Sequence, residues 1–264
     1  MIFSNSDILT YFKGIVPSRI VSLVPSHTQT LHYFNLETEV LGITKFCIAP
    51  DEWFKTKVRV GGTKTVNIEK VGALRPELII ANKEENDKST IEILGKTHVV
   101  WLTDIITFDD LYDFIFTLGK IIEQLLKSQN LVSEIKQMFS NQKNLFQKEN
   151  LKVAYAIWNK PLMLAGDNTF INSVLKNLGF DNIATKLNGR YPECAEATIK
   201  KLQLDVFFLS SEPFPFNTKH QNAYSIKLKP TLIVLANGEL FSWYGSGILK
   251  LEQHIIELKQ TILL

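Results

Sequence analysis

One pattern occurs twice in the chain, as NIEKVGALRPELIIA at residues 67–81 and as CAEATIKKLQLDVFFL at residues 194–209. In each copy a short helical segment leads into an apolar run rich in β-branched or aromatic residues, which is typical of an α/β unit. The copies lie in different halves of the 264-residue chain. The repeat predicts two similar lobes, and we expect the functional site in a cleft between them.

The composition is that of a nearly neutral globular protein. The 29 Lys and Arg residues against 27 Asp and Glu give a net charge of +2, so we expect no nucleic-acid partner. No run approaches the roughly 18 uninterrupted apolar residues of a membrane span, so we expect no membrane insertion. The first residues lack the basic and apolar regions of a secretory signal. We therefore expect a cytoplasmic protein, or a periplasmic one if the true start lies upstream.

The first part of the chain alternates strands with helices. Apolar runs predict strands at residues 20–24, 40–44, 78–81 and 99–102. Ser26, Asn67 and Asn86 are expected to cap the helices between them. This alternation implies right-handed βαβ units and a parallel sheet flanked by helices. We therefore predict an N-terminal α/β lobe over residues 1–106.

A long helix is predicted next, followed by a second lobe. From Thr107 to about residue 147, apolar residues recur at helical spacing, which indicates one helix of about 60 Å with Gly119 as its weakest point. Residues 107–150 are thus expected to form a connecting backbone helix. Strands at 153–158, 206–209 and 232–235, with helices between them, predict a C-terminal α/β lobe over residues 151–264.

The residues that follow the strands are the ones expected to contact a ligand, because ligands of parallel α/β sheets bind at the carboxyl ends of the strands. The loops of the second half are rich in aromatic residues, and Pro213 and Pro215 fix the loop around Phe214, which suits a rigid planar ligand. Arg190 suits a carboxylate or phosphate clamp, or equally an ion pair with Glu193 or Glu212. The predicted ligand contacts are His27, Phe46, Cys47, Trp53, Asn159, Arg190, Tyr191, Glu212, Phe214, Phe216, Trp243 and Tyr244.

Motifs of common enzyme classes are absent from the sequence. It contains no GxxxxGK[ST], GxGxxG, HExxH or GxSxG motif, and its five histidines lack metal-ligand spacing, so we predict neither a catalytic residue nor a metal site. Cys47 is the one credible nucleophile, with His27 as its candidate base, although a half-buried thiol or a ligand contact is the favoured interpretation. Cys47 and Cys194 fall in different halves, which excludes a stapled framework and leaves one disulfide between them as an alternative.

Several longer motifs resemble one known family. They are RIVSLVPSHTQTLHYFNL from residue 19, KFCIAP from residue 45, RVGGTK from residue 59, GDNTFI from residue 166, LSSEPFPF from residue 209 and NGELFSWYGS from residue 237. Together they resemble the helical-backbone periplasmic-binding-protein superfamily, in particular its vitamin B12 binding branch, without a signal peptide. The resemblance covers about residues 19–260. It implies two α/β lobes joined by one backbone helix, with a ligand held between the lobes.

The resemblance also implies that a carboxylate on each lobe docks with an ABC permease. Glu69 stands eight residues before Glu77, where the docking glutamate of the family stands. In the second copy the equivalent position is Ala197, and the nearest acid, Glu196, is displaced by about 100° around a helix. We therefore expect Glu69 and Glu196 to differ as docking residues, which puts the permease partner in doubt.

Three functions remain open at this point. The main hypothesis is a non-enzymatic ligand-binding protein of the ABC-importer type, which holds a corrinoid (cobalamin-like) or related planar metal complex in the interlobe cleft and has no intrinsic cofactor. The alternative is a cytosolic hydrolase or transferase that uses Cys47 and Glu212 in the same cleft. A third hypothesis is a protein-interaction module.

Overall fold

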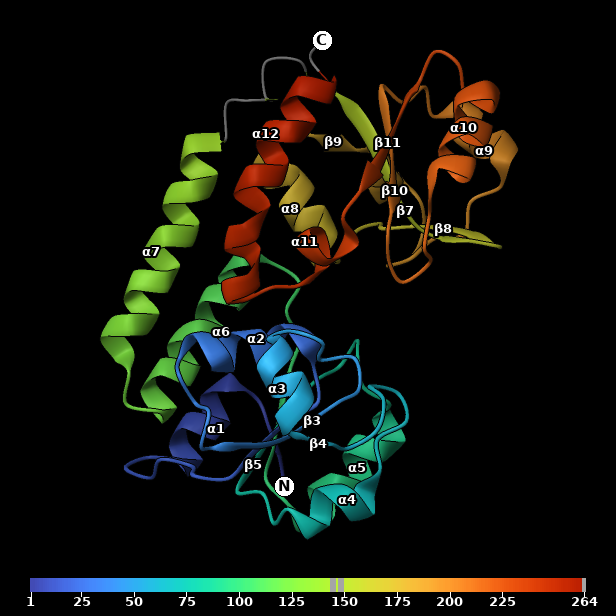
Figure 1. Ribbon diagram of the computed structural model, residues 1–264. Helices are drawn as coiled ribbons and strands as arrows, with labels where there is room; N and C mark the ends of the chain where they lie inside the picture. The colour runs from blue at the N-terminus through green and yellow to red at the C-terminus, as the bar shows by residue number, and fades with distance from the viewer. Residues whose placement is uncertain (143–145, 147–149, 263–264) are drawn as a thin grey trace. The chain divides into compact units, whose positions relative to one another are not determined.

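The computed structural model describes residues 1–142, 146 and 150–262. The chain divides into two compact units (Figure 1). Unit 1 comprises Met1–Glu134 and Trp243–Gly247, and unit 2 comprises Ile135–Ser242 and Ile248–Leu264. The short segment Trp243–Gly247, here called the strap, therefore belongs to the first unit although it lies near the end of the sequence.

Unit 1 is built on a parallel sheet with the strand order β1-β6-β5-β2-β3-β4. Its strands are β1 (Ile2–Phe3), β2 (Ile20–Ser22), β3 (Val40–Ile43), β4 (Val58–Arg59), β5 (Leu78–Asn82) and β6 (Val100–Thr103). Every residue of β2 and β5 is buried, as expected for central strands covered on both faces. The four predicted strands are present, and two residues each of β1 and β4 extend the sheet at its edges.

The helices of unit 1 include α1 (Asn5–Tyr11), α2 (Pro25–Tyr33), α3 (Asp51–Thr56), α4 (Ile68–Ala73), α5 (Lys88–Thr97) and α6 (Phe108–Ile121), the last of which begins the long helical region. Asn67 caps α4 as predicted, since its side chain accepts a hydrogen bond from Lys70 N. Two predicted caps are wrong. Ser26 lies inside α2, which begins at Pro25, and Asp87 caps α5 while the Asn86 amide donates to carbonyl oxygens of Leu23 and Thr63.

The predicted continuous helix over residues 107–147 is two helices, α6 and α7 (Leu125–Gln142). Glu123 between them has a φ of 56°, and Gln124 N donates to Gly119 O at 2.8 Å. Gly119 permits this tight turn, because a Cβ there would overlap the Ser128 side chain. Apolar spacing continues across the turn because both helices bury one face, so periodicity alone did not reveal the break. The predicted helix end near residue 147 lies outside the described residues.

Unit 2 has a sheet with the order β11-β10-β7-β8, and β9 also pairs with β7. The strands are β7 (Lys152–Asn159), β8 (Leu162–Leu164), β9 (Asp181–Asn182), β10 (Val206–Ser210) and β11 (Leu232–Ala236). Neighbouring strands are parallel except for β7 and β8. Only Lys160 and Pro161 separate β7 from β8, and so short a connection joins antiparallel strands.

Helices flank the sheet of unit 2 on both faces, with α8, α11 and α12 on one side and α9 and α10 on the other (Figure 1). They are α8 (Phe170–Leu178), α9 (Glu196–Lys201), α10 (Thr218–Lys227), α11 (Gly238–Ser242) and α12 (Leu251–Ile262), with 3-10 turns η1 (Ile183–Lys186) and η2 (Ser246–Lys250). The predicted helix from residue 247 thus begins as a 3-10 turn. Both units have the α/β architecture that the repeated pattern predicts.

The repeat is reproduced residue by residue. In each copy a six-residue helix ends and a residue with positive φ follows, Arg75 at 47° and Gln203 at 50°. An acid then precedes the strand and accepts a hydrogen bond from a backbone N–H at the start of the neighbouring strand in unit 2, or two residues before it in unit 1. Ser18 N donates to Glu77 at 2.6 Å, and Lys152 N donates to Asp205 at 2.7 Å. The two sequences therefore form the same local structure in both units.

A buried polar network lies at the carboxyl ends of β5 and β6. The Thr103 hydroxyl donates to Ala81 O at 3.0 Å and lies 3.3 Å from His27 Nε2. Because the only hydrogen of the Thr103 hydroxyl is used in this bond, His27 Nε2–H must donate to Thr103 Oγ1. Nδ1 is therefore the unprotonated nitrogen of the ring. Nδ1 is buried and has no hydrogen-bond partner among the described residues. Burial lowers the pKa of His27 to about 3, so the ring is neutral in the native state.

The strap closes over this network. The Tyr244 ring lies 5.3 Å from the His27 ring, centroid to centroid, and the His27 ring stacks at 4.6 Å on Phe114. Ser246 N donates to Thr30 Oγ1 at 3.2 Å. Gly245 has a φ of 90°, and a Cβ on it would overlap Thr30 Oγ1. Gly245 is therefore required both for its conformation and for the close approach of the strap to α2.

We predict that Gly245→Ala lowers the free energy of unfolding by about 2–4 kcal/mol, since it adds an overlap to a left-handed conformation. Gly14→Ala is the matched control, because Gly14 also has a positive φ of 74° but no atom lies within 4 Å of its Cβ position. Gly14→Ala should lower the free energy of unfolding by about 1 kcal/mol. Urea unfolding of both variants measures the difference, and equal losses would contradict the proposed packing of the strap.

We predict that His27 makes the protein less stable in acid. Its pKa is about 3 in the folded chain and near 6.5 when unfolded, so between these values the unfolded state binds more protons and stability falls as the pH falls. From pH 7 to pH 5 the loss should be about 2 kcal/mol. In His27→Phe this part of the loss should vanish. Urea unfolding of both proteins at the two pH values tests this, and an identical loss in the variant would refute it.

Candidate ligand-binding surfaces

In unit 1 the loop after β3 carries an exposed apolar surface. Phe46 and Ile48 are each 50% exposed, while Cys47 between them is buried. Lys45 Nζ lies 5.1 Å from the centroid of the Phe46 ring. The loop forms a turn here, since Cys47 N donates to Thr44 O at 3.2 Å, and only the Cys47 side chain faces the interior. Phe46 is thus exposed, and its contact with a ligand stays a prediction.

The Cys47 side chain is buried and contacts two threonine hydroxyls. Its Sγ lies 3.1 Å from Thr28 Oγ1 and 3.2 Å from Thr44 Oγ1. Burial raises the pKa of the thiol, although these hydrogen bonds oppose the shift. A nucleophilic cysteine must be deprotonated and accessible to its substrate. This site favours neither deprotonation nor access. The predicted pairing with His27 also finds no support, because His27 Nε2 faces Thr103. Cys47 and Cys194 are both free thiols, so no disulfide joins them.

Other predicted contacts in unit 1 are buried within the unit. His27 is fully buried, Trp53 is 1% exposed and packs edge-on against His32 at 5.2 Å, and Tyr244 is 6% exposed. Burial raises the pKa of Tyr244 well above its usual range. In this packing a ligand does not reach these three rings. The prediction assumed that aromatic side chains on loops are seldom buried, but the rings of Trp53 on α3 and Tyr244 on the strap point into the core. Trp243 of the strap is half-buried.

In unit 2 two of the predicted aromatic residues, Phe214 and Phe216, lie together with Trp158 and His220, which were not predicted as ligand contacts. Trp158 at the end of β7 is 39% exposed, and its ring lies 5.7 Å from the Phe214 ring in an edge-to-face arrangement. Phe214 lies 4.7 Å from Phe216, and His220 contacts both rings at 5.3 and 5.4 Å. We call these four residues the aromatic cluster. Phe216 is 5% exposed and supports the cluster from within the core, whereas Trp158 presents its surface.

The predicted polar contacts of unit 2 are held by neighbouring groups. Asn159 Oδ1 accepts a hydrogen bond from the Tyr224 hydroxyl at 3.3 Å. Glu212 Oε1 accepts one from the Ser242 hydroxyl at 2.9 Å. The Arg190 guanidinium lies 6.0 Å from the Tyr191 ring centroid, and both residues are half-buried. These contacts fix the side chains before any ligand is bound, which reduces the entropy that binding would cost.

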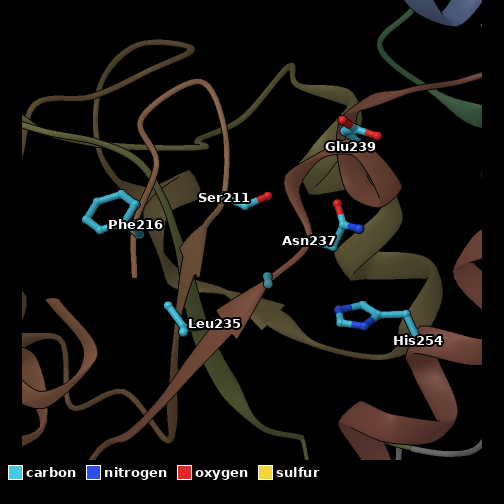
Figure 2. Close-up of a pocket in the computed structure, with 7 residues that line it drawn as sticks. Ser211, Phe216, Leu235, Asn237, Glu239 and His254 are labelled. Atoms are coloured by element: carbon cyan, nitrogen blue, oxygen red, sulfur yellow. The ribbon is translucent and has the colours of Figure 1, made fainter. Parts of the chain in front are cut away.

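A pocket of about 520 Å³ opens in unit 2 next to the aromatic cluster (Figure 2). Its lining comes from the loop after β10, the end of β11, α11 and α12, and consists of Ser211, Phe216, Leu235, Ala236, Asn237, Glu239 and His254. Sequence reasoning named only Phe216. Asn237 directly follows β11, so the expectation that ligands bind at the carboxyl ends of strands could have identified it. No local sequence pattern indicates His254 on the last helix.

The two candidate docking acids lie at equivalent helices but at different positions. Glu69 is exposed and is the second residue of α4, whereas Glu196 is exposed and is the first residue of α9. Ala197 is therefore the structural equivalent of Glu69. Lys227 Nζ lies 2.8 Å from Glu196 Oε2, and this hydrogen bond lowers the pKa of the Glu196 carboxyl. Glu196 is thus already paired within unit 2.

The described part of the chain contains neither a metal-binding cluster nor a membrane-spanning helix. Over residues 1–142, 146 and 150–262, no group of three or more His, Cys, Asp or Glu side chains is arranged to hold a metal ion. Within the same ranges, no helix combines the length and the apolar character needed to cross a membrane.

Comparisons with known sequences agree with this architecture. A family model described as periplasmic binding protein matches residues 20–232. An uncharacterised ABC transporter substrate-binding lipoprotein of Bacillus subtilis is 30% identical over 208 residues, which cover 75% of this chain and 64% of the relative. The match thus spans slightly less than two thirds of that protein. A vitamin B12-binding protein of Pectobacterium carotovorum is 20% identical over 244 residues, or 91% of this chain and 87% of the relative.

Solved structures share the fold. The periplasmic vitamin B12 binding protein of Vibrio cholerae superimposes with a TM-score of 0.78 at 20% identity, covering 92% of this chain and 98% of the other. A periplasmic heme binding protein from Pseudomonas aeruginosa gives 0.79 at 20% identity, covering 94% and 93%. With a family model matched from β2 to the start of β11 and the same fold in these structures, the chain belongs to the periplasmic binding protein family.

Proposed function

We propose that this chain is the substrate-binding protein of an ABC importer and that its ligand is a corrinoid (cobalamin-like) or a related planar metal complex. The aromatic cluster is the observation that carries this proposal. Its rings hold one another by edge-to-face contacts, and Trp158 remains 39% exposed at the end of β7. A fixed, partly exposed aromatic surface binds a flat ligand at low entropic cost.

The relatives support a ligand of this kind. Several are named vitamin B12-binding proteins, and neighbouring structures are named for vitamin B12, heme or a siderophore. These ligands are all large metal complexes, and the first two are macrocycles. The exposed Phe46 and Ile48 of unit 1 provide a second apolar surface suited to such a ring. We favour the corrinoid because vitamin B12 recurs in the names of the relatives.

The environment of Cys47 is an argument against the enzyme alternative. That alternative requires a reactive Cys47, but the thiol is buried and its pKa is raised. The expected cytoplasmic location also lacks support, because the relatives are named as lipoproteins or as periplasmic proteins. We therefore place the proposed binding function outside the cytoplasm.

We further propose that an ABC permease contacts the protein mainly through Glu69. This carboxylate is exposed at the start of α4, where a basic pocket of a partner can reach it. Glu196 in contrast is engaged by Lys227. A partner must displace this lysine before it can use Glu196, so the two units contribute unequally.

Cyanocobalamin should bind the full chain with one site and a Kd in the micromolar range or below, about −8 kcal/mol or stronger. Trp158→Ala should weaken binding about tenfold, because it removes the exposed ring of the cluster. Ile226→Ala is the control, since Ile226 is 75% exposed in the same unit but outside the cluster. Isothermal titration calorimetry measures all three. Absence of heat with cobalamin, cobinamide, haemin and ferric siderophores alike would contradict the proposal.

Glu69→Ala should reduce stimulation of the cognate importer's ATPase about tenfold, equivalent to ~1.4 kcal/mol of docking free energy. Ligand affinity should not change. Glu92→Ala serves as the control, because Glu92 is an exposed acid on α5 of the same unit. Glu196→Ala should have a smaller effect than Glu69→Ala. The importer reconstituted in vesicles provides the assay, and equal stimulation by Glu69→Ala and Glu92→Ala would rule out the role of Glu69.

A further inference from the structure

We infer that the pocket of unit 2 is a subsite that binds a carboxamide side arm of the ligand through its N–H donors. This inference rests on the proposed function and sharpens it. Corrinoids carry carboxamide arms around the ring, whereas haem carries carboxylates. A pocket that offers hydrogen-bond acceptors and negative charge therefore selects the first class over the second.

The acidic group of the pocket is Glu239 at the start of α11. It is half-buried and lines the pocket, and it forms no hydrogen bond or ion pair within the described part of the chain. The carboxylate can only accept hydrogen bonds. No lysine or arginine is among the residues that line the pocket. A carboxylate arm placed here would face Glu239 without a counter-charge, whereas an amide N–H would find an acceptor.

His254 of α12 provides a second acceptor. Its Nδ1 lies 3.3 Å from Glu257 Oε2, and because a carboxylate accepts, Nδ1 carries the proton of the neutral ring. Nε2 is then an acceptor. It is buried and has no hydrogen-bond partner among the described residues. Figure 2 shows the ring turned from α12 toward Asn237, at the end of β11. An unpaired buried acceptor beside a pocket favours a ligand that brings a donor.

The rest of the lining fits the carbon and carbonyl atoms of an amide arm. Phe216, Leu235 and Ala236 form the apolar part of the lining. Gly238 N donates to Ser211 Oγ at 2.9 Å, which leaves the Ser211 hydroxyl hydrogen free to donate to an amide carbonyl oxygen. Asn237 can donate or accept.

The pocket adjoins the aromatic cluster. Phe216 lines the pocket, and its ring lies 4.7 Å from Phe214 in the aromatic cluster. The inferred subsite for the arm and the proposed surface for the ring are therefore neighbours within unit 2.

The test compares two corrinoids that differ at their arms. Dicyanocobinamide has carboxamides, and dicyanocobyrinic acid has carboxylates at these positions. The full chain is titrated with each by calorimetry, as wild type, Glu239→Lys and Glu252→Lys. Glu252 is an exposed acid on α12 that does not line the pocket, so its variant makes the same charge change elsewhere in unit 2.

Wild type and Glu252→Lys should bind dicyanocobinamide at least tenfold more tightly than dicyanocobyrinic acid. Glu239→Lys should reduce this ratio to near one or invert it. If dicyanocobinamide binds but Glu239→Lys keeps the wild-type ratio, the subsite is wrong while the proposed function stands. If wild type binds neither corrinoid, the proposed function fails and the subsite fails with it.

Discussion

The same backbone constraint fixes the strand register in both units. Glu77 accepts a hydrogen bond at 2.6 Å from Ser18 N, two residues before β2, and Asp205 accepts one at 2.7 Å from Lys152 N, the first residue of β7. These bonds hold β2 against β5 and β7 against β10 at their amino ends. Because the register of a parallel pair is then set, the loops at the opposite ends are placed as well. The proposed ligand contacts Phe46 and Phe214 lie on loops at this edge of their sheets.

Burial then separates the loop residues into two groups. In unit 1 the strap, α2 and α6 enclose His27 and Tyr244, and the exposed apolar surface is left to Phe46 and Ile48. In unit 2 the rigid loop after β10 carries Phe214 against Trp158 and leads into the pocket that contains Glu239. The aromatic surface and the acceptor-rich pocket suit the proposed ligand, which is planar at its centre and bears hydrogen-bond donors at its edge.

The sequence was sufficient to predict the α/β class, the central strands and the cap at Asn67, because each depends on local composition and hydrophobic spacing. It did not reveal the break at Glu123, where both helices keep one buried face, or the hairpin of β7 and β8. Of the aromatic cluster it identified Phe214 and Phe216 as candidate contacts, but neither Trp158 nor His220. The sequence did not reveal features that depend on tertiary packing. No local pattern shows that the strap belongs to unit 1 or that His254 and Asn237 line one pocket.

The central claim is that the protein selects a corrinoid. Equilibrium dialysis of the full chain against equal concentrations of dicyanocobinamide and haemin, followed by the visible absorption spectrum of the retained protein, tests it most directly. We expect the corrinoid bands at one equivalent per chain, because the acceptor-rich pocket favours amide arms over carboxylates. Retention of the haem Soret band without corrinoid bands would contradict it.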